Sequence, residues 1–242
     1  MSLTDRQFGL LQLSIDAIIE KLASLRLNLE IEYDFKSLVA FMEATGAFLN
    51  PTFNPKYCSQ TKQSFWFRVL NEQGVTVGSH ASKILHADDF FELMETERLW
   101  FDEGKREEYG KGEFRARLYR PMMMISGTIS HAGAFWVEPS YRKRGLGVYL
   151  PYLGRSLNLR NHQIDYQTAI VLKPLADSHV PELTYGYTHV ERCLSGYFPV
   201  TGREEDVSLC YMTQNECLEQ LDQLPWHPQF PVSLGRELKL AG

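Results

Sequence analysis

The sequence predicts a mixed α/β fold, in which helices pack against a sheet. Apolar residues recur at steps of three and four in residues 7–29, which predicts an amphipathic helix. Short runs of β-branched and aromatic residues elsewhere predict strands, and these runs alternate with helical stretches along the chain. With 242 residues, of which 44% are hydrophobic, the chain is long enough to bury a core.

The N-terminal third should contain a second helix and a hairpin. The helix is predicted over residues 35–45 and should stop at Gly46. Two Asn-Pro dipeptides, at positions 50 and 54, then indicate an irregular connection. Residues 65–70 and 75–77 are apolar and flank a polar turn, which makes them the clearest hairpin of the chain.

The pattern continues to alternate in the rest of the chain. Residues 88–112 carry many acidic and basic side chains, and we interpret them as a helix followed by a polar loop around 104–112. A long strand or a broken pair of strands is predicted over 114–137. After it we expect a helix that ends near residue 161, a strand at 166–172, a short helix from Pro174, a strand at 207–212 and a helix at 215–224.

The segment that follows residue 137 has the features of an anion-binding turn. Residues 133–137 predict a strand, Pro139 cannot extend a central strand, and three consecutive cations precede a Gly-x-Gly sequence that opens a leucine-rich helix. The first N–H groups of a helix have no internal partner and carry the positive end of its dipole. We therefore expect an anion cradle here, the alternative being a solvated turn whose glycine serves only tight packing.

These residues resemble the acetyl-coenzyme A motif of the GNAT superfamily of N-acetyltransferases. The resemblance is carried by Val137-x-Pro139-x-Tyr141-Arg142-x-x-Gly145-x-Gly147, and the surrounding order of hairpin, strand and short helix is similar over about residues 60–215. It implies a GNAT-like acyltransferase fold with an N-terminal helical extension. It also implies a donor, acetyl-coenzyme A, whose pantetheine arm lies like a strand between two splayed strands.

The resemblance also implies which residues bind the donor. The backbone near Trp136 and Val137 would contact the thioester end. The pyrophosphate would lie on the following loop, which consists of Arg142, Lys143, Arg144, Gly145, Leu146, Gly147 and Val148. Lys143 and Arg144 would either neutralise the 3′-phosphate or stay in solvent.

The residues that move protons are predicted from the same resemblance. His131 lies six residues before Val137, where the family often has a Glu or His that faces the amine, and an imidazole titrates near neutral pH. The alternative is a hydrogen-bonded histidine without a catalytic role. Family members often protonate the thiolate with a Tyr, but Glu182 occupies that place, so Tyr185 or Tyr187 would substitute.

A proline within the cradle helix is a second departure from the family pattern. Pro151 lies in the second turn and lacks the N–H that would continue the helical ladder, so it should cost one backbone hydrogen bond and bend the helix.

The function implied is transfer of an acetyl or other short acyl group from coenzyme A to a primary amine by direct attack in a ternary complex. The acceptor would be a small molecule or a peptide. We expect its pocket to come from residues 1–60 and 88–120, neither of which contains a recognisable motif. A non-catalytic GNAT-like module that binds acyl-coenzyme A or a protein partner is the alternative, and it is favoured by the missing Tyr.

Two other motifs are weak. His86 and Asp88, with His131 or His162, imitate the ligand set of an iron oxygenase, but long helices do not fit that all-β fold. Residues 104–112 imitate a P-loop, but the spacing is one residue too long and no Ser or Thr follows the lysine. We therefore predict no bound metal.

Composition suggests a compartment and a domain division. The net charge of −5 argues against nucleic-acid binding, four scattered cysteines suggest a reduced cytoplasmic protein, and no apolar run is long enough for a membrane span. We expect a helical extension over residues 1–58, a GNAT-like domain over 59–225 and a tail over 226–242. The apolar face of residues 7–29 could cover the sheet or form a homodimer.

Overall fold

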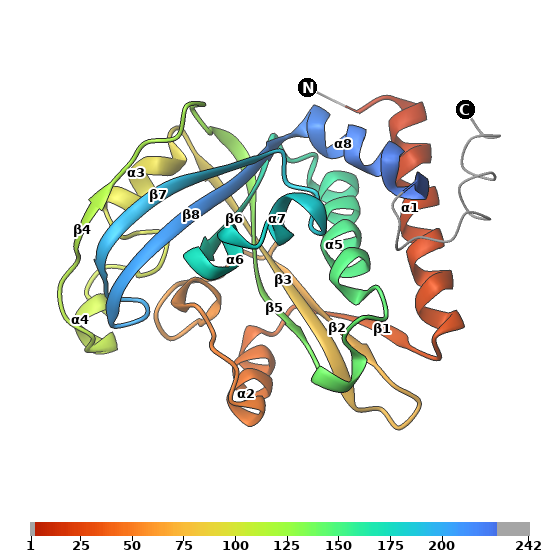
Figure 1. The fold of residues 1–242 in the computed structure, drawn as a ribbon, viewed down its shortest axis with the longest axis horizontal. Helices are drawn as coiled ribbons and strands as arrows, with labels where there is room; N and C mark the ends of the chain where they lie inside the picture. Colours follow the sequence, from red (N-terminus) through yellow and green to blue (C-terminus); the bar gives the residue numbers. More distant parts are fainter. Residues whose placement is uncertain (1–2, 227–242) are drawn as a thin grey trace.

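A computed structural model describes residues 3–226, and within them one mixed sheet organises the chain (Figure 1). The sheet has eight strands in the order β1-β2-β3-β5-β6-β8-β7-β4. All neighbouring pairs are antiparallel except β5 and β6, which run parallel and are joined by a crossover through helix α5. The predicted mixed α/β class is confirmed.

The strands are β1 Asn28–Glu32, β2 Phe65–Leu70, β3 Thr76–Ala87, β4 Arg115–Leu118, β5 Gly127–Val137, β6 Tyr166–Leu172, β7 His189–Phe198 and β8 Arg203–Thr213. The α-helices are α1 Asp5–Ser24, α2 Phe35–Thr45, α3 Phe90–Glu95, α4 Lys105–Tyr109, α5 Leu146–His162, α6 Lys173–Asp177, α7 Val180–Leu183 and α8 Gln214–Gln223. Short 3-10 turns lie at Pro51–Phe53, Pro139–Tyr141 and Leu224–Trp226.

The first helix is shorter than the apolar pattern predicts. Helix α1 begins at a capping box, in which Thr4 and Gln7 exchange hydrogen bonds between side chain and backbone. It ends at Ser24 rather than near residue 29 because the chain turns at Arg26, whose φ of 57° is left-handed. The last apolar residue of the expected stripe, Leu29, lies on β1, which pairs with β2 at the edge of the sheet.

Three helices cover one face of the sheet and bury the largest core. Helices α1, α5 and α8 lie together on this face, to the right in Figure 1. Their apolar sides pack against inward residues of β2, β3 and β8, among them Phe67, Val69 and Met212. Two smaller cores lie elsewhere, one around Trp100 and Phe198 and one around Phe53 and Trp66.

The region between residues 88 and 137 differs from the prediction. The helix expected there is the short α3, and the predicted polar loop contains a second short helix, α4. The broken pair of strands exists as β4 and β5, but β4 pairs with β7 at the far edge of the sheet. Strand β7 itself was not predicted. The helix α2, the hairpin of β2 and β3, strand β6, helix α6, strand β8 and helix α8 are confirmed, with β3 and β8 longer than expected.

Candidate active site

The parallel strands β5 and β6 separate halfway along their length. They pair from Ile129 with Tyr166 to Ala132 with Ala169, and no pairing follows. Beyond this apex, residues 133–137 of β5 stay paired with β3, and residues 170–172 of β6 stay paired with β8. Within the described residues, the facing edges of the two strands therefore present backbone groups without a strand partner, as an added extended ligand requires.

A β-bulge sets the separation. Ala134 has a φ of 47°, and the register between β3 and β5 shifts between Ser79 and Ala81. An extra residue bends a strand and increases its local twist. The Ser79 hydroxyl donates to the Ala134 carbonyl at 2.9 Å, which holds the bulge in place.

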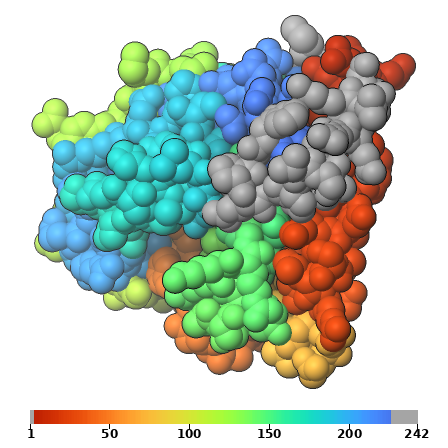
Figure 2. Space-filling model, turned by 45° about the vertical axis from the view of Figure 1, so that its right-hand side comes forward, coloured from red at the N-terminus to blue at the C-terminus, as the bar shows by residue number. Residues whose placement is uncertain are grey.

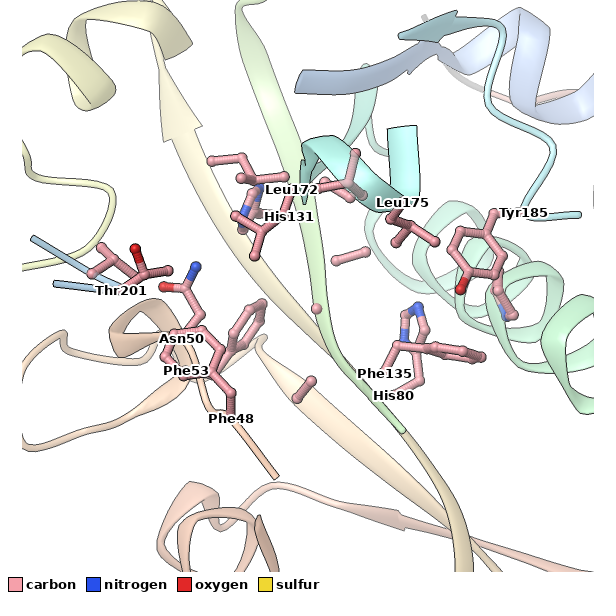
Figure 3. Close-up of a pocket in the computed structure, with 18 of the residues that line it drawn as sticks. Phe48, Asn50, Phe53, His80, His131, Phe135, Leu172, Leu175, Tyr185 and Thr201 are labelled. Atoms are coloured by element: carbon pink, nitrogen blue, oxygen red, sulfur yellow. The ribbon is translucent and has the colours of Figure 1, made fainter. Parts of the chain in front are cut away.

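A cavity of about 500 Å³ passes through the sheet at this separation. Its near half lies on the α5 side and is lined by residues that pack with the large core, including Phe135, Leu175 and Tyr185. Its far half lies on the opposite side and is lined by residues of the smaller cores, including Phe53 and Phe198. Figure 3 shows the two groups on either side of β5.

The predicted anion cradle lies at the end of β5. Gly145 is the residue before α5 and has a φ of 86°, a conformation that L side chains rarely adopt. A Cβ at this position would come within 2.4 Å of the Tyr149 ring. The N–H groups of Val148 and Tyr149 bond to the Gly145 carbonyl. Within the described structure the N–H groups of residues 143–147 have no protein acceptor, so they remain available to an anion at the helix start.

The three cations of the cradle occupy different positions. The Arg142 guanidinium donates from Nε to the Val137 carbonyl at 3.3 Å and so ties the loop to the end of β5. The Arg144 guanidinium lies over the Tyr141 ring, 4.7 Å from its centroid. Lys143 has a left-handed φ of 64° and an exposed side chain. Figure 2 shows the green segment of the cradle at the surface beside α1.

His131 lies at the apex and is buried. Its Nδ1 shares a hydrogen bond of 2.9 Å with Thr168 Oγ1 across the parallel pair. Its ring stacks on Phe53, at a centroid distance of 6.0 Å, and lines the cavity. Burial, with a smaller contribution from the charge of Lys83, lowers the pKa of His131 to about 3. The expectation that this ring titrates near neutral pH is therefore wrong, and the imidazole is neutral at pH 7.

Tyr185 and Tyr187 both line the near half of the cavity. Burial raises the pKa of Tyr185 to about 12 and raises that of Tyr187 as well, so both phenols stay protonated. The fully buried Arg155 on α5 holds this wall, because its guanidinium donates to the Tyr185 carbonyl at 2.7 Å and to Gln167 Oε1 at 3.0 Å. Gln167 donates in turn to the Tyr187 hydroxyl at 3.5 Å.

The pH dependence of stability should reveal the two buried histidines of the cavity. Burial lowers the pKa of His80 to about 3, as it does for His131. The unfolded chain binds protons to both rings below pH 6.5 and the folded chain does not until about pH 3, so the free energy of unfolding should fall as the pH drops. The slope is at most about 1.4 kcal/mol per pH unit for each ring. Urea unfolding between pH 5 and 6.5 measures it.

The variant His131→Gln is the control for that measurement. It removes one titrating ring, so its stability should depend on pH less steeply over this range than that of the wild type, while His80 and the partly buried His162, whose pKa burial also lowers, keep the remaining slope. Parallel curves for the two proteins would show that His131 titrates normally.

Several cavity residues could not be found by the sequence analysis. The wall of the far half includes Phe48, Asn50 and Phe53, which lie within the 1–60 segment expected to form the acceptor pocket. No residue of the 88–120 segment lines the cavity. Phe90 of this segment packs behind the cavity wall, with its ring centroid 5.8 Å from that of His131. The turn between β7 and β8 supplies Val200, and no motif marks it.

Two further expectations concern the helices next to the cradle. Pro151 lies inside α5, which stays helical from Leu146 to His162, and it lines the cavity. Glu182 lies on α7, with its carboxylate 3.6 Å from Nδ1 of His179. Glu182 is not among the residues that line the cavity.

Within residues 3–226, no group of three or more His, Cys, Asp or Glu side chains lies close enough together to bind a metal ion, so the residues that resemble an iron-oxygenase ligand set are not brought together. None of the helices in this part of the chain combines the length and the apolar character that crossing a bilayer requires.

The order and placement of strands, cradle and helix around the cavity agree with those that the resemblance to the GNAT superfamily implies. A strand ends in a glycine cradle, a helix starts from that cradle, and the next parallel strand splays away from the first. The fold expected from the motif is therefore confirmed in the features that surround the cavity.

Comparisons with solved structures return N-acyltransferases at low identity. NAA60 of Arabidopsis thaliana in complex with acetyl-CoA is 14% identical, with a TM-score of 0.47, and the match covers 78% of this chain and 99% of that chain. A dodecameric spermidine N-acetyltransferase of Vibrio cholerae is 12% identical, with a TM-score of 0.47, and the match covers 81% of this chain and 98% of that chain. FeeM, an N-acyl amino acid synthase from uncultured soil microbes, is 12% identical, with a TM-score of 0.46, and the match covers 79% of this chain and 93% of that chain. Comparison with protein-family models and with curated proteins gave no match.

Proposed function

We propose that this chain is an N-acyltransferase of the GNAT type, which transfers an acetyl or other short acyl group from coenzyme A to a primary amine. One observation carries the proposal: the anion cradle of residues 142–148 lies at the end of the same strand whose free edge opens the cavity through the sheet. A phosphate site joined to a slot with free backbone groups fits a ligand that has a pyrophosphate and an extended amide-containing arm.

The donor would bind in two parts. The free N–H groups of residues 143–147 would hold the pyrophosphate, with Lys143 and Arg144 near enough along the chain to neutralise a further phosphate. The arm would then lie in the separation and hydrogen-bond to backbone groups of β5 near Trp136 and Val137. The thioester would reach the apex between Ala132 and Ala169, where the cavity turns toward His131.

The reaction would proceed by direct attack. The neutral amine attacks the thioester carbonyl, the new C–N bond makes the amine proton more acidic, and the neutral imidazole of His131 accepts that proton. The tetrahedral intermediate then expels the thiolate, which takes a proton from Tyr185 or Tyr187. Both phenols are protonated at neutral pH, although burial, by raising their pKa, also makes them weaker proton donors. The products are an amide and free coenzyme A.

The alternative, a module that binds acyl-coenzyme A without turning it over, rests on two observations. Glu182 occupies the place of the usual Tyr, and burial gives His131 a low pKa. Both reduce the chemical capacity of the site but leave the cradle and the slot complete.

Release of free thiol separates the two functions. We expect the purified protein to release coenzyme A from acetyl-coenzyme A when a panel of primary amines is added, with the matching amide detected by mass spectrometry. A binding module would release no more thiol than the amine-free blank, and that result would contradict the proposed reaction. His131→Gln serves as the low-activity reference.

A further inference from the structure

The far half of the cavity differs in chemistry from the near half. It is lined mainly by apolar side chains from three separate parts of the chain, namely the segment after α2, the end of β6 and the turn between β7 and β8. The residues are Phe48, Phe53, Ile170, Leu172, Phe198 and Val200. Phe53, Phe198 and Val200 are each only 1% exposed and belong to the core, Ile170 and Leu172 are partly buried, and Phe48 is 55% exposed at the rim.

Some of the polar atoms in this half already have protein partners. Asn50 Oδ1 accepts hydrogen bonds from the backbone and the hydroxyl of Thr52, and the Thr201 hydroxyl donates to the Phe198 carbonyl. His131 is neutral at pH 7 and bonded to Thr168. Among the described residues that line the cavity there is no Asp, Glu, Lys or Arg.

A charge-free wall discriminates strongly between amines. A second ammonium group buried there would lose its hydration free energy. No carboxylate lines the wall to form an ion pair with it, so this cost would not be offset. An alkyl or aromatic group loses nothing and gains from leaving water. The reacting amine itself must be neutral, and an apolar site favours the neutral form of a base.

We propose that the acceptor is a primary amine attached to an apolar group, an alkylamine or arylalkylamine, whose apolar part fills the far half of the cavity. Its amino group would then lie at the apex beside His131, opposite the thioester in the near half. This inference rests on the proposed N-acyltransferase function and adds the class of acceptor to it. It excludes polyamines and other multiply charged amines as efficient substrates.

The test is a substrate series at saturating acetyl-coenzyme A. For 1-aminoalkanes from three to eight carbons, kcat/KM should rise about threefold to fourfold for each added methylene until the far half is full. 2-Phenylethylamine should be accepted, and spermidine should be at least a hundredfold poorer than 1-aminohexane. A spermidine rate equal to or above that of 1-aminohexane would overturn the inference.

A second series varies the donor. With 1-aminopropane as acceptor, lengthening the acyl group of the thioester from two to eight carbons should not raise kcat/KM. A steady rise with acyl length, together with no dependence on amine length, would show that the far half holds the acyl chain of the donor, and the proposed acceptor class would be wrong.

A matched pair of variants tests the wall itself. Leu172 is only partly buried at the end of β6, so it tolerates a polar replacement better than the core residues do. Leu172→Glu should raise kcat/KM for spermidine at least tenfold and lower it for 1-aminohexane, whereas Leu172→Gln should lower it for 1-aminohexane without helping spermidine. Unchanged preferences in both folded variants would overturn the inference.

These experiments test the acceptor class separately from the N-acyltransferase function. Turnover of charged amines but not of apolar ones refutes the acceptor class and keeps the N-acyltransferase. Absence of thiol release with every amine refutes both. Retained binding of acetyl-coenzyme A, measured by calorimetry, verifies that each variant is folded.

Discussion

Gly145→Ala should weaken the binding of acetyl-coenzyme A at least a hundredfold, a loss of about 2.7 kcal/mol of binding free energy. The new Cβ would meet the Tyr149 ring at 2.4 Å, and that ring is buried. Because the φ of 86° also disfavours an L side chain, the first turn of α5 must shift and its free N–H groups lose their common direction. Isothermal titration calorimetry measures the affinity.

Gly110→Ala is the matched control for this variant. Gly110 also has a positive φ, of 75°, but a Cβ there would meet no atom within 4 Å, and it lies after α4 at the other end of the sheet. It should lose stability through backbone strain and keep its affinity for acetyl-coenzyme A. Equal affinity for the donor in Gly145→Ala and Gly110→Ala would refute the assignment of the cradle.

His131→Gln should lower kcat by about a hundredfold to ten-thousandfold, the usual contribution of a positioned proton acceptor. The donor affinity should not change, because His131 lies at the apex, at the opposite end of the slot from the cradle. Steady-state kinetics with the best amine of the substrate series measure both quantities. A kcat within threefold of the wild-type value would remove His131 from the mechanism.

A companion variant separates position from proton transfer. Thr168→Val removes the hydroxyl that bonds to Nδ1 of His131 and keeps the ring, so it should lower kcat less than His131→Gln does.

In the wild type, kcat/KM should rise with pH as the acceptor loses its proton and show no step between pH 6 and 7, because burial lowers the pKa of His131 to about 3. A step in that range that disappears in His131→Gln would contradict the buried neutral ring.

The local features of the site were accessible from the sequence because each depends on residues close together in the chain. Pro139, Gly145 and Gly147 lie within nine positions, and the backbone physics of a glycine turn before a helix fixes what they form. Strand β6 was predicted for the same reason, since an apolar run of neighbouring residues is a local signal.

The non-local features were not accessible. The pairing of β4 with β7 joins residues about eighty positions apart, and nothing in either strand specifies the partner. The far wall of the cavity brings Phe53 and Val200 to the same space. The low pKa of His131 likewise depends on burial beneath Phe53 and Phe90, which a count of residues along β5 cannot show.

Hydrogen–deuterium exchange with and without acetyl-coenzyme A tests the central claim most directly, because it reads the backbone amides that should hold the donor. We predict slower exchange in peptides that cover residues 142–148 and 133–137 when the ligand is bound, and no change in the peptide of helix α4. Protection confined to other segments, or unchanged exchange in both peptides at saturating ligand, would contradict a donor site formed by the cradle and the separated strands.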